Sequence, residues 1–369
     1  MRKWNRTLAF ALVVLLAASL VSACSKPEQT KTEPPKQEAK KEVPKKLKVG
    51  LVFDVGGKGD LSFNDSAYAG LQKAAKEFGD KIEIKDLEPS GGGENREQLL
   101  RALAEQKYDL IFGVGFLFTD HIKKVAQEFP NSKFGLIDGY IENLNDKSNV
   151  ASLLFKEQEG SFLVGAAAGY ATRTNKVGFV GGMKIPLIEK FEAGYIAGVK
   201  YANPKVQIFS DYIGTTGEAF KDPVKGKELT LSDINKGADV IYHASGASGI
   251  GVIEAAAEKG KLAIGVDSDQ SLTAKESQRK FVLTSMLKRV DNSVYFTIKD
   301  LVNGKFTGGY KVFGLAEDGV GYAMNDYNKE LMKDIAPKLE ELKKKINSKE
   351  IEVPTDKKTL DEFLKKLPK

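Results

Sequence analysis

The chain has 369 residues, 41% of them hydrophobic and 29% charged, and a formal net charge of +6. Residues 1–23 hold three basic residues and no acidic one, residues 25–48 hold eight lysines and four glutamates, and the rest holds 45 basic and 46 acidic residues. A nearly neutral folded part gives no electrostatic reason to expect a nucleic-acid partner. With one cysteine, Cys24, and two histidines, His121 and His243, we also expect no disulfide and no metal site there.

The first residues have the order of an export signal. A short basic stretch, residues 1–6, precedes an apolar run of 15 residues, Thr7–Val21, and two small residues then lead to Cys24. This order predicts a signal peptide over residues 1–23. Cys24 resembles the acylated cysteine of a bacterial lipobox, although Val21 stands where leucine is most common. The alternative, a transmembrane anchor with an incidental cysteine, needs ~20 apolar residues. We therefore expect a lipid anchor on the extracytoplasmic face of a bacterial cell membrane.

Residues 24–46 have the composition of a disordered tether. Lysine and glutamate dominate, the prolines are Pro27, Pro34, Pro35 and Pro44, and large apolar side chains are almost absent. Such a segment buries too little surface to offset the entropy of ordering it. Its charge is more typical of a solvated spacer than of a nucleic-acid patch. We expect it to hold a folded domain away from the membrane.

From residue 47 onward, short apolar runs typical of buried strands alternate with helical patterns, which predicts parallel sheets with helices on both faces. In the first half, we expect strands at 47–53, 81–84, 109–114 and 133–138 and helices at 66–78, 94–106 and 119–129. The pattern restarts with a helix at 158–172 and strands at 176–180, 206–209, 240–242 and 262–266. The later helices are expected at 186–201, from about 224, and at 249–258, followed by a returning strand at 281–287. Two successive four-strand units indicate two similar lobes.

Ligands of open α/β sheets lie beyond the carboxyl ends of the strands, and here these positions share one chemistry. They carry acids, amides, aromatic rings and glycines: Asp54, Phe63, Asn64, 113–116, Asp138, 181–183, 220–222, 245–249 and 267–269. A carboxylate can accept two hydroxyl hydrogen bonds from a sugar diol, and an aromatic face can stack on a flat ring. Each residue alone is also typical of ordinary turns and caps, so the interpretation depends on the set.

At these positions, the chain resembles a known family. Residues 49–57, VGLVFDVGG, and 60–71, DLSFNDSAYAGL, are similar to the opening of the basic membrane protein family. Its PnrA-like group consists of purine nucleoside-binding lipoproteins of ABC transporters. Shorter similar runs follow at 113–116, 134–138, 178–182, 191–195, 222–228, 267–270 and 312–320.

The resemblance implies the type I periplasmic binding fold, in which two doubly wound α/β lobes are joined by three crossovers and the ligand lies in the cleft between them. We assign residues 47–153 and 284–313 to the first lobe and residues 154–283 and 314–369 to the second. The resemblance also implies a monomer that captures a purine nucleoside of the guanosine, adenosine and inosine class. It would deliver this ligand to the permease and ATPase subunits of an importer.

The resemblance assigns roles to individual residues. Asp54, Phe63 and Asn64 would contact the ligand from the first lobe. Phe220 would face Phe63 from the second lobe, so that two rings enclose the base. Gly246 opens a glycine-rich turn between a strand and a helix, which suits the close approach of backbone amides to a ligand.

The sugar would be held by other residues. Asp267 and Lys288 would bind the ribose hydroxyls, and Asp138 would read the base or the sugar edge. Lys288 could instead be a solvated surface lysine, but its place after a returning strand favours the cleft. Phe191 contacts the ligand or packs its own helix, and Asp120 caps a helix or reaches the base.

An enzyme is the main alternative class. The chain has no Gly-x-Gly-x-x-Gly at its first βα turn, no P-loop lysine motif and no Gly-x-Ser-x-Gly. A nucleoside hydrolase would cluster aspartates around calcium, but Asp54, Asp60 and Asp65 lack that dense motif. We therefore expect no catalysis and no cofactor. A lipoprotein for a sugar or a signalling molecule remains the alternative within the same fold, although Phe63 and Phe220 favour a flat base. A purely structural lipoprotein would leave the polar strand ends unexplained.

Overall fold

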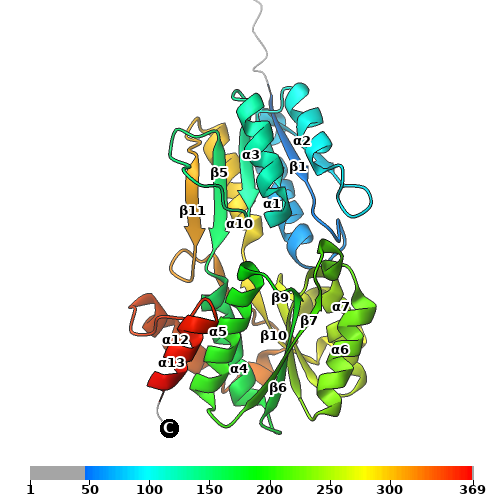
Figure 1. Ribbon diagram of the computed structural model, residues 1–369, viewed down its shortest axis with the longest axis vertical. Coiled ribbons are helices and arrows are strands. Elements are labelled where there is room, and N and C mark those ends of the chain that lie inside the picture. Colours follow the sequence, from blue (N-terminus) through cyan, green and yellow to red (C-terminus); the bar gives the residue numbers. More distant parts are fainter. Residues whose placement is uncertain (1–45, 368–369) are drawn as a thin grey trace, which may run out of the picture. The chain divides into compact units, whose positions relative to one another are not determined.

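The computed structural model describes residues 46–367, so the predicted signal peptide and tether, apart from Lys46, lie outside the described residues. Residues 46–367 form two six-stranded sheets with helices on both faces (Figure 1). The predicted fold class, two doubly wound α/β lobes, is confirmed. None of the helices within these residues is both long enough and apolar enough to cross a bilayer.

The first sheet has the strand order β11-β5-β4-β3-β1-β2, and all its strands are parallel. Helices α1 and α10 pack together on one face, and α2 and α3 pack together on the other. The strands are β1 (Leu47–Val52), β2 (Ile82–Leu87), β3 (Leu110–Gly113), β4 (Lys133–Ile137), β5 (Val150–Phe155) and β11 (Gly309–Phe313). The helices are α1 (Phe63–Phe78), α2 (Arg96–Glu105), α3 (Thr119–Glu128) and α10 (Val290–Val302), with short 3₁₀ turns η1 (Gly79–Lys81) and η2 (Phe116–Phe118).

The second sheet repeats this order as β12-β10-β9-β8-β6-β7, with only the edge strand β12 antiparallel. Its strands are β6 (Lys176–Met183), β7 (Gln207–Gly214), β8 (Val240–Ala244), β9 (Leu262–Asp267), β10 (Val282–Lys288) and β12 (Val320–Tyr322). Its longer helices are α4 (Glu157–Ala171), α5 (Pro186–Ala202), α6 (Pro223–Asn235), α7 (Gly249–Glu258), α12 (Ala336–Asn347) and α13 (Lys357–Lys366). Its shorter elements are η3 (Gly217–Phe220), η4 (Gly246–Ser248), α8 (Gln270–Thr273), α9 (Glu276–Arg279) and α11 (Lys329–Met332).

Both faces of each sheet are covered, which explains why the central strands are nearly continuous apolar runs. In β1, for example, Val49 and Leu51 pack in one buried cluster with α1 and α10, whereas Val52 packs in another with α2 and α3. Parallel pairing under this cover brings the carboxyl ends of the strands of a sheet to one edge. The strand-end loops of both lobes therefore become the place where a site can form.

The chain passes between the two sheets three times, and two of these passages correct the predicted lobe boundaries. The strand β5 continues to Phe155 in the first sheet, so residues 154–155 lie with the first lobe. The strand β10 pairs with β9 and β12 in the second sheet as far as Lys288. The predicted division between residues 283 and 284 is wrong because it splits this one continuous strand.

Each sheet also has two strands beyond the four-strand unit that the pattern predicted. In the first sheet these are β5 and β11, and in the second they are β10, expected only as a returning strand, and β12. The strands β11 and β12 are reached only after residue 300, and β12 has three residues. Short edge strands of this kind pair with partners far away in sequence, so a local pattern of apolar residues gives little sign of them.

Helices α4 and α5 lie side by side in close contact (Figure 1). Glycines make this contact possible, since a methyl group at Gly198 would lie 2.0 Å from the carbonyl oxygen of Phe162, and one at Gly165 would lie 2.2 Å from that of Tyr195. The pair matters for the site because α4 begins with Glu157 and α5 carries Lys190 and Phe191.

We predict that Gly198→Ala lowers the free energy of unfolding by roughly 1–3 kcal/mol, because the methyl group forces the two helix backbones apart. Urea denaturation followed by circular dichroism measures the change. Gly321→Ala is the matched control, since a methyl group there meets no atom within 4 Å and should change stability by less than about 0.5 kcal/mol. Equal effects of the two substitutions would show that the close helix contact does not limit stability.

Candidate functional site

A cavity lies where strand-end loops of the two lobes meet. It contains about 590 Å³ of space that is not occupied by protein atoms, part of it open to solvent. Nine of the ten residues predicted for ligand contact line it: Asp54, Phe63, Asn64, Asp138, Phe191, Phe220, Gly246, Asp267 and Lys288. The tenth, Asp120, lies exposed in the first turn of α3 and does not line the cavity or cap the helix with its side chain.

Four phenylalanine rings form the apolar walls. Phe63 and Phe116 come from the first lobe, and Phe191 and Phe220 come from the second. The ring that contacts Phe220 is that of Phe116, at 6.4 Å between centroids and an interplanar angle of 69°. The ring pair that spans the two lobes is thus Phe116 and Phe220, and Phe63 lines the same cavity. Gly182 makes room for Phe220, because a methyl group at that position would lie 2.3 Å from the ring.

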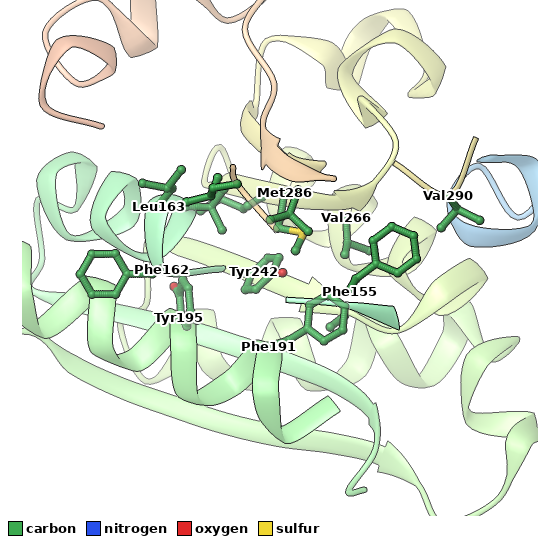
Figure 2. Close-up of a cluster of buried hydrophobic side chains, with 14 of the residues drawn as sticks. Phe155, Phe162, Leu163, Phe191, Tyr195, Tyr242, Val266, Met286 and Val290 are labelled. Carbon is green, nitrogen blue, oxygen red and sulfur yellow. The ribbon is translucent and has the colours of Figure 1, made fainter. Parts of the chain in front are cut away.

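The wall formed by Phe191 continues into the buried core of the second lobe. Figure 2 shows Phe191 beside Phe155, with Val266 and Met286 nearby in the same cluster. Phe191 therefore packs its own helix, one of its two predicted roles, and it also borders the cavity, so that contact with a ligand stays a prediction. A ring fixed in this way loses little conformational entropy when a ligand arrives.

The polar end of the cavity is built around the ammonium group of Lys288, which is only 1% exposed. Its Nζ lies 2.5 Å from Asp138 Oδ2 and 3.1 Å from Glu157 Oε1, and Lys190 Nζ lies 3.2 Å from Glu157 Oε2. Burial alone would lower the pKa of Lys288, but the carboxylates of Asp138, Glu157 and Asp267 outweigh it and raise the pKa. Lys288 is therefore a permanent cation and not the solvated lysine of the alternative interpretation.

Asp138 contributes an acceptor that the protein does not use. Its side chain is 4% exposed, and Oδ1 is buried with no hydrogen-bond partner among the described residues. Burial raises the pKa of this carboxyl to about 6, although Lys288 acts to lower it. A buried acceptor without a donor is costly, so Asp138 Oδ1 suits a hydroxyl or N–H group of a ligand.

Asp267 is the counterpart of Asp138 in the second lobe. The strands β4 and β9 hold the same place in their sheets, and the aspartate at the end of each has a left-handed backbone, with φ of 63° and 64°. Such a conformation is uncommon outside glycine and marks strained positions. Burial raises the pKa of Asp267 to about 7, while Lys288 and a hydrogen bond from Ser62 act to lower it.

Hydrogen bonds beside Asp267 join the two lobes. Ser62 Oγ donates to Asp267 Oδ2 at 2.5 Å, and Ser268 Oγ donates to the carbonyl of Ser62 at 3.3 Å. Gln270 Nε2 donates to the carbonyl of Leu61 at 3.2 Å, and Leu61 itself has a φ of 57°. The loop before α1 is thus held by the loop after β9.

His243 orients the glutamine of this contact. Its Nε2 lies 2.8 Å from Gln270 Oε1, and the same oxygen accepts from the backbone N–H of Val266 at 2.9 Å. His243 Nε2 must therefore carry the proton and donate it. Burial lowers the pKa of His243 to about 4, so the ring is neutral and serves as a fixed donor.

The predicted contact residue Asn64 also braces the loop before α1. Its Oδ1 accepts from the N–H of Asp54 at 2.9 Å, and its Nδ2 donates to Asp60 Oδ2 at 3.0 Å. Asp60 in turn accepts from the N–H groups of Ser62, Asn64 and Asp65. Asp60 therefore accepts hydrogen bonds from the free N–H groups at the N-terminus of α1, where a negative charge is favourable. No group of His, Cys, Asp or Glu within residues 46–367 has the arrangement of a metal site.

Gly246 follows β8 with a φ of 55°, and a methyl group at this position would lie 3.1 Å from the carbonyl oxygen of Phe220. Both the left-handed backbone angle and the limited space favour glycine at this position. It lets the turn after β8 close on the loop that carries Phe220.

Comparison with known proteins identifies the family. A family model described as ABC transporter substrate-binding protein PnrA-like matches residues 47–357. The chain belongs to this family. It is 37% identical to the CD4+ T-cell-stimulating antigen of Listeria monocytogenes over 95% of this chain and 99% of that one. It is 34% identical to basic membrane protein A of Borreliella burgdorferi over 96% and 98%, and 38% identical to an uncharacterized lipoprotein of Pyrococcus abyssi over 85% and 76%.

Solved structures agree with this placement. A solute-binding protein of an ABC transporter system from Aeropyrum pernix is 34% identical, with a TM-score of 0.76, over 86% of this chain and 97% of that chain. A glucose-galactose binding protein from Geobacillus stearothermophilus, at 17% identity, a TM-score of 0.55 and 76% and 98% coverage, shares the fold. The resemblance stated from the sequence is confirmed, and the family is one of substrate-binding proteins.

Several cavity residues of this PnrA-like protein were missed from the sequence. Phe116 and Ser245 were among the strand-end positions selected from the sequence but were not assigned to the ligand, whereas Leu187 and Ile188 of α5 gave no signal. Glu157, which is fully buried, lies just after the first passage between the lobes. A buried acid at a helix N-terminus next to a lobe boundary is the signal that could have identified it.

We predict that Asp267→Asn stabilises the protein at neutral and alkaline pH. The carboxyl titrates at about 7 in the folded chain and near its model value of 3.8 when unfolded, so its contribution to stability is full below pH 3.8 and is lost as pH rises to about 7. Above pH 7 the variant should be more stable, by on the order of 1–3 kcal/mol. Below pH 4 the two proteins should converge. Urea denaturation between pH 3.5 and 8.5 tests this, and a variant that is less stable at pH 8 contradicts the assignment.

Proposed function

We propose that this protein captures purine nucleosides and delivers them to an ABC importer. The observation that carries the proposal is the pairing, in one cavity, of four phenylalanine rings with two buried carboxylates beside a buried lysine. Flat apolar walls suit a base, and the charged end suits a sugar diol. The membership of the chain in a family of ABC substrate-binding proteins supports the transport role.

The ribose is proposed to lie at the polar end. Asp267 would accept from the 2′- and 3′-hydroxyl groups, because a carboxylate has acceptor sites for both at once. Lys288 would donate to a hydroxyl oxygen, and its ion pairs with Asp138 and Glu157 fix its position. The unpartnered Oδ1 of Asp138 would accept from a further hydroxyl group.

The base is proposed to lie between rings of opposite lobes. Phe63 and Phe116 would contact it from the first lobe, and Phe220 from the second, so that binding stabilises the contact between the lobes. Stacking of this kind contributes about 1–3 kcal/mol per base in nucleic-acid binders. A free sugar has no flat ring to use these walls, and this disfavours the alternative of a sugar-binding lipoprotein.

The carrier is proposed to be anchored through an acylated Cys24 and to hand its ligand to permease and ATPase subunits. The export signal and the isolated cysteine in the sequence support the anchor. A relative named as a lipoprotein in Pyrococcus abyssi agrees with it. The tether of residues 24–46 would then allow the domain to reach its permease.

A thermodynamic cycle tests the nucleoside pose. Removing the ribose hydroxyls, by replacing inosine with 2′,3′-dideoxyinosine, should weaken binding by roughly 1.5–3 kcal/mol, and Asp267→Asn should weaken inosine binding by a similar amount. The dideoxy compound should lose little further affinity on the variant, because the hydrogen bonds are already gone. Isothermal titration calorimetry measures all four combinations.

D-Ribose and guanosine complete that experiment. If ribose alone binds as tightly as inosine, the rings contribute nothing and the protein is a sugar carrier. If no purine nucleoside binds at millimolar concentration, the proposal is wrong. Additive losses in the cycle would mean that Asp267 does not bind the ribose hydroxyl groups, and the proposed orientation of the nucleoside in the cavity would be wrong.

The lipid anchor predicts that Cys24→Ser moves the protein from the membrane fraction to the soluble fraction and abolishes labelling by a fatty-acid analogue. Fractionation with a high-salt wash measures this, because the wash removes protein held only by charge. Ser22→Ala, next to the predicted cleavage site, is the control and should stay lipidated. A Cys24→Ser protein that remains in washed membranes would contradict the anchor.

A further inference from the structure

Only one of the two carboxylate oxygens of Asp54 accepts hydrogen bonds from the residues that the structure describes. Oδ1 accepts from the N–H of Val55 at 2.7 Å and from Arg96 Nη2 at 2.9 Å. Oδ2 accepts no hydrogen bond from the residues that the structure describes, and it lies beside Gly115, where a methyl group would come within 2.2 Å of it. Glycine at 115 therefore leaves room for Oδ2 beside the cavity that both residues line.

The side chain of Arg96, which pairs with this carboxylate, is itself buried and held by several contacts. It is 7% exposed at the start of α2, and its Nη1 donates to the carbonyl of Gly93 at 3.1 Å. Gly93 has a φ of 97°, and a methyl group there would lie 2.1 Å from the guanidinium carbon of Arg96. The guanidinium also lies 5.6 Å from the ring centre of Phe118. Backbone, ring and carboxylate together fix its orientation, although Arg96 does not line the cavity.

This ion pair is separate from the charged cluster around Lys288. Burial raises the pKa of Asp138 and of Asp267, and the charge of Lys288 opposes that rise, whereas the cation that opposes the rise for Asp54 is Arg96. Asp54 lies instead beside Gly115, and the next residue, Phe116, packs its ring against Phe220. The carboxylate of Asp54 therefore borders the aromatic part of the cavity, where the proposed function places the base.

We infer that Arg96 is a positioning residue for base recognition: by pairing with Oδ1 of Asp54, it holds this carboxylate so that Oδ2 is the oxygen left to accept a hydrogen bond from the ligand. An ionised carboxylate can only accept hydrogen bonds. The site then selects purine nucleosides whose base edge presents an N–H donor, such as the N1–H of a 6-oxopurine. A base with a substituted or unprotonated nitrogen at that edge leaves a buried charge without a donor, which is costly. This inference rests on the proposed function and specifies which base edge that site reads.

The charges around Asp54 determine how it responds to the loss of Arg96. Burial raises its pKa even with Arg96 in place, and Arg96 acts to lower it, so removing the guanidinium should raise this pKa further. The other polar and charged groups near Asp54 are Asp60 and Asn64 beside α1, Glu88 and Lys221 at a neighbouring cavity, and Asp138, Asp267 and Lys288 in the main cavity. Of the three cations Arg96, Lys221 and Lys288, Arg96 is the one that forms an ion pair with Asp54.

The test compares inosine with 1-methylinosine, which lacks the N1–H but has the same ribose. The ratio of their dissociation constants, measured by calorimetry from pH 6 to pH 9, cancels the titration of Asp138 and Asp267 at the sugar. The native protein should prefer inosine roughly 10-fold or more at every pH. In Arg96→Met the ratio should fall towards one at pH 6 and recover as the pH rises and Asp54 ionises.

Arg101→Met is the matched control, because Arg101 lies on the same helix and pairs with Glu97 and Glu128 on its outer side. It should leave the ratio unchanged. Arg96→Lys keeps the cation and should retain most of the preference. If Arg96→Met does not fold, Asp54→Asn serves instead, since it replaces the free acceptor with a donor and must abolish the preference.

Two results would overturn the inference. A native ratio of one would mean that Asp54 does not read an N–H donor, although the nucleoside function would stand. Equal losses for both ligands in Arg96→Met, with a ratio that does not change with pH, would mean that Arg96 only supports the fold. If the native protein binds neither nucleoside, the proposed function fails before this inference is reached.

Discussion

A buried ammonium group among three carboxylates is the interaction on which the rest of the site depends. Removing these charges from water is costly, and the cost is recovered only if each has close partners of opposite sign. Asp138 follows β4 of the first lobe, Glu157 begins α4 directly after one passage between the lobes, and Lys288 ends β10 directly before the next. The cluster thus joins both lobes to two of the segments that connect them. A displacement of any of these segments would leave a buried charge without a partner, so the polar end of the cavity is geometrically well defined.

The two cation–carboxylate pairs at the cavity are separate from each other. Lys288 pairs with Asp138, Arg96 pairs with Asp54, and four phenylalanine rings line the walls of the cavity. Several acids in this region have raised pKa values because of burial. A chain selected only for stability would replace such groups with neutral ones, so their retention is typical of a binding site. The interlobe hydrogen bonds of Ser62, Ser268 and Gln270 add a directional contact beside the acids.

The fold and most cavity-lining positions were predictable from the sequence because both follow from local patterns. Alternating strands and helices imply parallel sheets, and parallel sheets bring their strand ends together; Asp54, Asp138 and Asp267 were found in this way. Arg96, Glu157 and Lys190 were not found because they act through other side chains, and the distances that define this role exist only after folding. Phe116 was at a recognised position, but a pattern gives no side-chain direction. The boundary error at residue 284 has the same origin, since strand pairing is a long-range property.

The repeated order of the two sheets has a consequence for which molecules can enter. The strands β5 and β10 hold the same place in their sheets, yet one ends in Phe155 and the other in Lys288. The repeat thus supplies an aspartate twice, as Asp138 and Asp267, but a cation only once at these strand ends. With Asp54 and Glu157 included, carboxylates outnumber the cations Lys288, Lys190 and Arg96 that pair with them. Since each of these cations is already paired with a carboxylate, a phosphate group that entered the cavity would meet hydrogen-bond acceptors and no unpaired partner among these three cations, whereas hydroxyl and N–H groups would find acceptors.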